Sequence, residues 1–337
     1  MKKNYMIIAA SLFLIFLIYS AVELIIPLPF GNKPIEFEIK RGTTFRQVVN
    51  DLAERGLVRD RWVIHVLGRV TGVDRKIKAG YYPFWGTMSP LEIFNAIRHG
   101  NIIEYEITVV PGDSLAEVGN KFSSLGIVSP AEFERLCTDK AFLDDLDVDA
   151  PSLEGYLFPD TYRFPKGLDV REALSMMVDR LREKFTDEMT GRALEMDLSE
   201  RDVLTMASIV EKEAVIDDER AIIAAVYFNR LKRNMPLQAD PTAIYGVKTS
   251  RERITREDLL RKTPYNTYVI KGLPPGPIAS PGLKSIQAVL NPADVPYLYF
   301  VSNYDGTHNF SLTLSSHEEA VKAYRDKKKS ASSKGAS

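Results

Sequence analysis

Two glutamates, Glu211 and Glu213, stand at the end of an apolar stretch that begins at Met206. On a helix they point about 200° apart, so one cleft can receive only one of them. Glu213 follows Met206 by seven residues and Ile209 by four, which places its carboxyl group on the apolar stripe of the helix. Burial there disfavours the charged form and raises the pKa, as a general acid near neutral pH requires. Glu213 is therefore the candidate catalytic residue.

Glu213 also has a structural interpretation. A glutamate at a helix end can turn back to solvent or pair with an arginine such as Arg220. Glu211, by contrast, lies at the edge of the apolar stripe. The helix pattern alone leaves both interpretations of Glu213 open.

Other catalytic chemistries lack their residues in this sequence. There is no Gly-x-Ser-x-Gly motif, and the one cysteine, Cys137, has no matched histidine. The histidines, which show no metal-ligand spacing, are His65, His99, His308 and His317. With 44 Lys and Arg against 45 Asp and Glu, the net charge of -1 gives no reason to expect a nucleic-acid partner. We therefore predict no metal, no organic cofactor and no nucleic acid.

Three loops rich in Tyr, Asn, Pro and Gly follow this segment, at residues 237–246, 265–268 and 272–278. Tyr rings can stack on the apolar faces of sugar rings, while Asn, Gln and Asp hydrogen-bond hydroxyl and acetamido groups. The loops therefore suit a carbohydrate ligand. Alternatively, their Tyr and Asn residues only stabilise turns.

The elements that must position these groups are mostly helices. We expect the helix that carries Glu213 over residues 200–214, and amphipathic helices over 170–185 and 218–232. An acidic, Pro-terminated segment indicates a domain boundary near 145–152.

That boundary separates an N-terminal region, 35–150, from a domain over residues 151–326. The tail, 327–337, is basic and then rich in Ser, Ala and Gly, so we expect it to be disordered. The predicted fold class is α+β, with a helix-rich domain around Glu213.

The N-terminal region contains a strand, turn and helix that recur, at residues 35–58 and 105–128. Pairs that share one offset of 70 residues are Gly42 and Gly112, Gly56 and Gly126, and Val58 and Val128. The shared offset favours a duplicated unit over a coincidence of two common motifs, which is the alternative.

Residues 5–26 form an apolar run of the length that spans a bilayer, after a short end, 1–4, that contains Lys2 and Lys3. The positive-inside rule keeps these lysines cytoplasmic, so the remainder of the chain is expected on the extracytoplasmic side of the membrane. A cleaved signal peptide is the alternative, but no small-x-small cleavage site follows the run.

Several longer motifs occur in one order along nearly the whole chain. They lie at residues 154–162 (EGYLFPDTY), 207–213 (ASIVEKE), 229–231 (NRL), 237–242 (LQADPT), 265–268 (YNTY) and 272–276 (GLPPG). Together they resemble the YceG-like family of endolytic murein transglycosylases. The resemblance implies a single N-terminal anchor and a LysM-like strand and helix module of the type associated with glycan binding.

The resemblance also implies that the second glutamate of the Glu-Lys-Glu motif, Glu213, is catalytic, in agreement with the helix pattern. The implied reaction cuts the MurNAc-GlcNAc β-1,4 bond of nascent peptidoglycan strands without water and leaves a 1,6-anhydroMurNAc end. Penicillin-binding proteins and other wall-synthesis factors are partners suggested by the family alone. From the family-like segments, the candidate substrate-binding residues are Gln238, Asp240, Thr242, Tyr265, Asn266, Tyr268, Asn303 and His308.

Two other functions stay open at this point. A peptidoglycan hydrolase would need a second carboxylate near Glu213, for which Asp240 and Glu154 are available. A non-catalytic glycan-binding scaffold would act through the repeated N-terminal unit and would not need Glu213.

Overall fold

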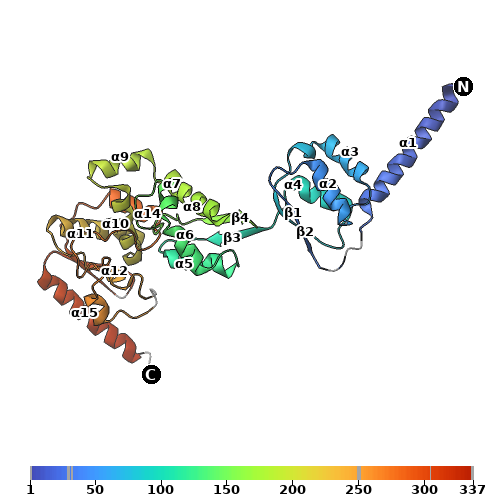
Figure 1. The fold of residues 1–337 in the computed structure, drawn as a ribbon. Helices are drawn as coiled ribbons and strands as arrows, with labels where there is room; N and C mark the ends of the chain where they lie inside the picture. Colours follow the sequence, from blue (N-terminus) through green and yellow to red (C-terminus); the bar gives the residue numbers. More distant parts are fainter. Residues whose placement is uncertain (1, 29–30, 32, 249–251, 304, 335–337) are drawn as a thin grey trace. The chain divides into compact units, whose positions relative to one another are not determined.

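The computed structural model describes residues 2–28, 31, 33–248, 252–303 and 305–334. Within these residues the fold is a mixed α+β structure with many helices and three separate two-stranded sheets, which agrees with the predicted class (Figure 1). The chain divides into two compact units, which we call unit 1 and unit 2. Unit 1 comprises the residues up to Glu106 together with Arg163–Leu168, and unit 2 comprises Ile107–Tyr162 and the residues from Asp169 onward.

The first unit contains most of the early elements: α1 (Lys2–Ile25), β1 (Ile35–Ile39), α2 (Phe45–Glu54), α3 (Arg61–Thr71), the 3₁₀ helix η1 (Val73–Arg75), β2 (Gly80–Phe84) and α4 (Pro90–His99). Two paired strands, β3 (Glu104–Thr108) and β4 (Thr161–Pro165), each have residues in both units. Unit 2 contains α5 (Leu115–Ser124), α6 (Pro130–Cys137), α7 (Lys140–Asp145), α8 (Val170–Lys184), α9 (Asp187–Glu195), α10 (Glu200–Glu213), η2 (Asp217–Glu219), α11 (Arg220–Lys232), α12 (Asp240–Ile244), α13 (Arg256–Leu260), α14 (Leu283–Leu290), β5 (Tyr299–Ser302), β6 (His308–Ser311) and α15 (Leu314–Lys334).

Helix α1 is long and apolar enough to cross a membrane. Its span Asn4–Ile25 has 22 residues and a mean hydropathy of 2.3. The predicted span at 5–26 thus coincides with one continuous helix.

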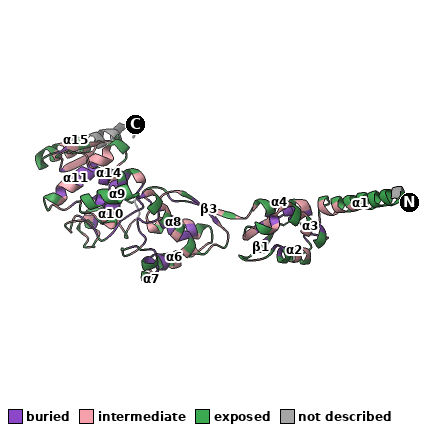
Figure 2. Ribbon diagram, turned by 90° about the horizontal axis from the view of Figure 1, so that it is seen from above, coloured by how far each residue is buried: buried purple, intermediate pink, exposed green. Residues whose placement is uncertain are grey.

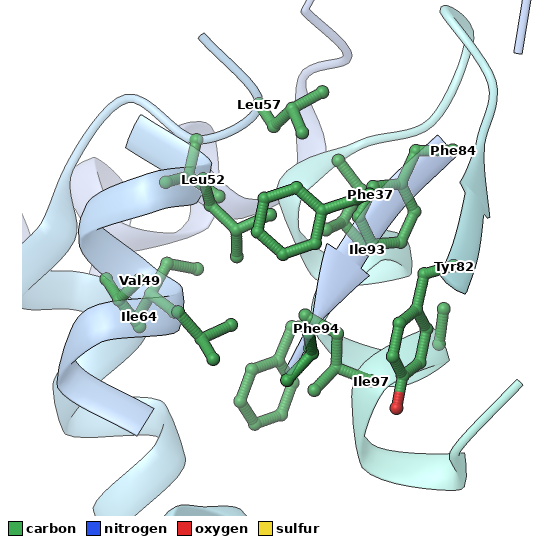
Figure 3. Close-up of a cluster of buried hydrophobic side chains, with 14 of the residues drawn as sticks. Phe37, Val49, Leu52, Leu57, Ile64, Tyr82, Phe84, Ile93, Phe94 and Ile97 are labelled. Atoms are coloured by element: carbon green, nitrogen blue, oxygen red, sulfur yellow. The ribbon is translucent and has the colours of Figure 1, made fainter. Parts of the chain in front are cut away.

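Strands β1 and β2 pair antiparallel, with Ile35 opposite Phe84 and Ile39 opposite Gly80. Their inner faces and three helices enclose the core of unit 1, which Figure 3 shows in close-up. Its labelled side chains are Phe37, Val49, Leu52, Leu57, Ile64, Tyr82, Phe84, Ile93, Phe94 and Ile97.

The order β1, α2, α3, β2 recurs as β3, α5, α6, β4, with α7 inserted before β4. Gly42 and Gly112 both turn the chain with positive φ (81° and 87°), and Gly56 and Gly126 both end their helices in the same way (70° and 69°). Glycine adopts this conformation without steric cost. The strand, turn and helix expected at 35–58 and 105–128 are thus present, and each continues into a second helix and strand.

Side-chain contacts repeat as well. Thr44 and Ser114 each begin their helix with a capping box, in which the side chain and the third helical residue exchange hydrogen bonds. In the closing strands, the hydroxyls of Tyr82 and Tyr162 each donate to the carbonyl oxygen four residues earlier, at 2.6 Å. The two copies therefore share local detail beyond the order of their elements.

The compact units divide at Glu106, whereas the sequence placed the boundary near 145–152. The reason is that the second copy is attached to the later part of the chain. The Gly112 N–H donates to the carbonyl oxygen of Ser280 (2.8 Å), and the Ser280 N–H donates to that of Asp113 (2.7 Å). Such long-range backbone contacts are invisible to composition.

The core of unit 2 lies around α10, which packs against α9, α11, α12 and α14. The hairpin of β5 and β6 pairs Tyr299 with Ser311 and Ser302 with His308. Helix α15 follows it and continues to Lys334. Residues 327–334 are therefore helical where a disordered tail was expected, because Ala and Lys favour helix continuation; residues 335–337 lie outside the described residues.

Candidate active site

Helix α10 presents Glu213 as its last residue. The helix starts after Ser199, which forms a capping box with Asp202. All eight residues from Val203 to Val210 are buried, so the helix is fixed by packing along its middle. It ends where Ala214 becomes extended, which leaves the Glu213 side chain at the edge of the core.

Glu211, two residues earlier, belongs to a different environment. Its carboxylate accepts from the N–H of Gly282 (2.9 Å) and the hydroxyl of Ser285 (2.8 Å), and it pairs with Arg220 (3.1 Å). Only 7% of its side chain is exposed. Glu211 therefore joins α10 to α11 and to the start of α14. The alternative in which Arg220 pairs with Glu213 is wrong, because Arg220 is directed to Glu211.

Glu213 makes no salt bridge with any residue that the structure describes. Burial raises the pKa of its carboxyl group to about 8, and the negative charge of Asp240 adds to the rise. The N–H of Asp240 and the hydroxyl of Tyr227 approach the carboxyl group and oppose the rise. The Tyr227 hydroxyl is buried and completes no hydrogen bond of normal geometry. At neutral pH, Glu213 therefore holds its proton and can donate it.

Asp240 and Tyr268 come from two separate loops and meet beside Glu213. Asp240 starts the short helix α12 and is exposed, and the Tyr268 hydroxyl donates to its Oδ1 at 2.5 Å. The charges of both Asp240 and Glu213 help to raise the pKa of Tyr268, after burial. Two predicted residues thus lie with Glu213 in one polar cluster.

Gln238 is exposed to solvent, and its neighbours hold it in place. It is exposed and has a positive φ of 52°, and its amide oxygen accepts from Nη1 of Arg230 at 3.1 Å. The same guanidinium donates to the carbonyl oxygens of Leu237 (2.9 Å) and Leu298 (2.7 Å). Arg230 therefore fixes the loop that leads into Asp240.

Thr242 and Asn266 are fully buried. The Thr242 hydroxyl bonds the Ala239 carbonyl oxygen (2.6 Å) and lies 2.8 Å from the Thr267 hydroxyl. Asn266 donates to three carbonyl oxygens within residues 258–261 and accepts from the N–H of Tyr268. Their polar groups are occupied within the protein, so they shape the loops around Glu213.

Tyr265 belongs to a second cluster, around Glu154. Its ring lies 4.6 Å from that of Tyr245, whose hydroxyl donates to Glu154 at 2.9 Å. Glu154 also accepts from the N–H of Leu115 at the start of α5 (3.0 Å). Burial raises the pKa of Glu154 to about 7. These bonds tie Glu154 to α5 and Tyr245, which weakens its candidacy as a second reacting carboxylate.

Asn303 and His308 lie at the β5 and β6 hairpin. The Asn303 amide donates to the Thr307 hydroxyl (3.0 Å) within the turn, and Nδ1 of His308 lies 2.6 Å from the carboxylate of Glu219. Asn303 therefore stabilises the turn of the hairpin, and His308 joins the hairpin to η2. No group of three or more His, Cys, Asp and Glu side chains in the described part of the chain is arranged to hold a metal ion.

Sequence reasoning missed Tyr227 and Arg230 as parts of the site. Both are buried on α11, four and seven residues after buried Ile223. Polar groups on the apolar stripe of a helix were the signal that identified Glu213, and the same pattern on α11 identifies this pair.

Residues 37–323 match the model of the YceG-like family. The chain belongs to the YceG-like family. It is 29% identical to an endolytic murein transglycosylase from Bacillus subtilis strain 168, over 86% of this chain and 84% of that protein. It is 26% identical to one from Streptococcus pneumoniae strain D39, over 86% of this chain but only 58% of that longer protein.

A solved structure also resembles this YceG-like chain. The 2.6 Å crystal structure of a YceG-like protein from Listeria monocytogenes has a TM-score of 0.60 and 27% sequence identity, and the match covers 85% of this chain and 98% of that one. The family match includes Glu213 and every other candidate residue described above.

Proposed function

We propose that this YceG-like chain is an endolytic murein transglycosylase with Glu213 as its catalytic acid and base. The curated relatives carry this activity in their names. The observation that supports the assignment to Glu213 is its position at the end of a core helix, where no described residue forms a salt bridge with its carboxyl group and burial raises its pKa to about 8. Such a group holds a proton for the leaving oxygen at neutral pH.

The proposed reaction breaks the bond between C1 of MurNAc and O4 of GlcNAc. Glu213 donates its proton to O4 as this bond breaks, and the C6 hydroxyl of the same MurNAc attacks C1. The Glu213 carboxylate then takes the proton of that hydroxyl and is ready for another cycle. The products are a 1,6-anhydroMurNAc end and a GlcNAc 4-hydroxyl end, and no water is consumed. Since the attack is intramolecular, neither a nucleophilic carboxylate nor a second base is required.

Asp240 has two roles in this proposal. Its negative charge raises the pKa of Glu213, and it stabilises the positive charge that develops on the sugar ring at C1. Tyr268 holds the Asp240 carboxylate in place. Gln238, exposed and fixed by Arg230, is positioned to bind sugar hydroxyl or acetamido groups.

Digestion of purified peptidoglycan by the detergent-solubilised full chain tests the proposal. Mass spectrometry of the fragments is expected to show anhydroMurNAc ends from within the strands. Reducing MurNAc ends would instead support hydrolysis, the second candidate, which the proximity of Asp240 to Glu213 favours. Folded protein that cleaves nothing would support the scaffold function.

The pH profile of cleavage is expected to fall as the pH rises through about 8, because the acid form of Glu213 is lost there. Asp240→Asn removes the neighbouring negative charge and should move this descending limb of kcat/KM to lower pH. Initial rates across pH 5 to 10, with Tyr265→Phe as the control that leaves Asp240 in place, check the shift. An unmoved limb would show that Asp240 does not act on Glu213.

The βααβ order of residues 35–84 recurs over residues 104–165, which supports the LysM-like assignment of the N-terminal region that we include in the proposal. In unit 1 a pocket of about 420 Å³ lies between β1 and α2, lined by charged and apolar residues such as Glu38, Asp51 and Arg55. The hypothesis that follows from this assignment is that glycan chains of peptidoglycan bind in this pocket. Loss of glycan affinity in Asp51→Ala, measured by co-sedimentation with peptidoglycan, tests it.

For location, we propose that α1 anchors the chain in the cytoplasmic membrane with unit 2 on the extracytoplasmic side. The length and hydropathy of α1 support the anchor, and the nature of the substrate supports the side. Partners among penicillin-binding proteins and other wall-synthesis factors are part of the same hypothesis. Protease treatment of intact spheroplasts, which should digest unit 2, tests the orientation.

A further inference from the structure

Helix α3 carries an apolar stripe on its exposed face. Trp62, Val66 and Val70 follow one another at four-residue spacing and are 58%, 38% and 79% exposed. The opposite face is buried in the core through residues such as Val63 and Ile64. A stripe of this kind on a well-packed helix indicates a surface that contacts something apolar.

Helix α3 lies beside the end of α1 (Figure 1). The ring of Trp62 meets that of Phe16 edge-on at 5.4 Å, and the Tyr19 hydroxyl donates to Asp60, the N-cap of α3, at 2.9 Å. On α1, Phe16, Ser20, Glu23 and Leu24 are partly covered, whereas residues 4–15 are exposed throughout, as Figure 2 shows for most of the helix. The last turns of α1 thus pack on the rest of unit 1, and the earlier turns do not.

The position of Glu23 fixes how deeply this contact lies. About 20 residues cross a bilayer core, and counted from Asn4 they end at Glu23, where a carboxylate marks the outer limit of the hydrocarbon. Phe16 lies seven residues earlier, about 10 Å along the helix. That distance equals the depth, about 5–10 Å, to which interfacial helices bury their apolar face.

The charged residues around the stripe are also compatible with contact to a membrane surface. Arg61 is exposed, and the Arg69 side chain is 81% exposed with only a 4.0 Å approach to Asp74. The Asp60 carboxylate is occupied by the N–H groups of Trp62 and Val63. Basic residues beside an apolar face favour anionic headgroups.

From these contacts we infer that α3 docks on the membrane surface, with Trp62, Val66 and Val70 inserted at the boundary between the lipid headgroups and the acyl chains beside α1. The inference rests on the proposed anchor. In this arrangement unit 1 lies on the membrane surface, so the anchor fixes the orientation of unit 1 as well as its location.

Fluorescence quenching in vesicles tests the docking, because the chain has only two tryptophans, Trp62 and Trp85, with similar exposure (58% and 52%). The full chain is reconstituted in vesicles of phosphatidylcholine and phosphatidylglycerol that contain a phospholipid brominated near the headgroup. In Trp85→Phe, Trp62 is expected to be quenched at least about twofold more than Trp85 is in Trp62→Phe, because Trp62 belongs to the apolar stripe that contacts α1 and Trp85 does not belong to it.

Val70→Glu in the Trp85→Phe chain should reduce this quenching, while Leu194→Glu, at a position 72% exposed on α9, should not. Three results, in protein that floats with the vesicles, would overturn the docking of α3. They are equal quenching of the two tryptophans, no quenching of either, and no effect of Val70→Glu. Protein that fails to float would overturn the anchor itself, and the docking with it.

Discussion

Glu213→Gln is expected to reduce the rate of glycan cleavage by about 10²- to 10⁴-fold, the usual contribution of general acid and base catalysis. Gln keeps the volume and polarity of the side chain but can neither donate nor accept the proton at the glycosidic oxygen. In the cluster with Asp240 and Tyr268, Glu213 has a pKa of about 8, which suits this transfer. Single-turnover rates of anhydroMurNAc formation measure the loss.

The same variant should remain folded. The pKa of Glu213 lies above the ordinary value of 4.5, so the native state binds a proton that the unfolded chain releases between pH 4.5 and about 8. The wild type therefore loses stability as the pH rises through this window, and the Gln variant does not lose it from this group. Urea unfolding at pH 5 and pH 8 measures this difference. The free energy of unfolding of the variant, relative to that of the wild type, should be higher at pH 8 than at pH 5. Cleavage at near wild-type rates by Glu213→Gln would refute the proposed chemistry.

Glu211→Gln is expected to affect stability more than catalysis. It should lower the free energy of unfolding by about 3 kcal/mol, the lower end of the range for breaking a buried ion pair. The Glu211 and Arg220 side chains are only 7% and 12% exposed. Removing the Glu211 charge leaves Arg220 with the half-exposed Asp217 as its remaining carboxylate, which moderates the loss. Urea titration at pH 7 measures the change.

The control for this variant is Glu195→Gln, at an exposed pair with Arg192, which should change the unfolding free energy by less than about 1 kcal/mol. At a temperature where both variants are folded, Glu211→Gln should keep most of its cleavage activity. A variant that is fully stable yet inactive would show that Glu211 has been misassigned and that the two glutamates share the chemistry.

The sequence was sufficient for the features that depend on local pattern. The apolar stripe before Glu213 predicted both the helix and the unusual position of the carboxyl group, and α10 ends at that residue. The glycine spacing predicted the repeated strand, turn and helix, because positive φ at these positions leaves few alternatives.

Long-range contacts explain what pattern reasoning could not supply. Thr242 and Asn266 belong to two loop motifs typical of ligand binding, but both side chains are buried and bonded to neighbouring loops. The pairing of Arg220 with Glu211 rather than Glu213 depends on where η2 and α14 pack, which no periodicity encodes. Long-range contacts also explain why the compact units divide at Glu106 rather than near 145–152.

The chain crosses between the two units three times, which bears on how such a protein can be rearranged by recombination. Unit 1 is discontinuous: after unit 2 has begun, Arg163–Leu168 returns to it, where the Lys166 N–H bonds the carbonyl oxygen of Ile103 (2.9 Å) and its amine pairs with Glu36 (2.6 Å). A gene fusion with a single joint after Glu106 would separate these partners. Exchange of one unit for a foreign one therefore requires three coordinated joints, which favours inheritance of the two units together.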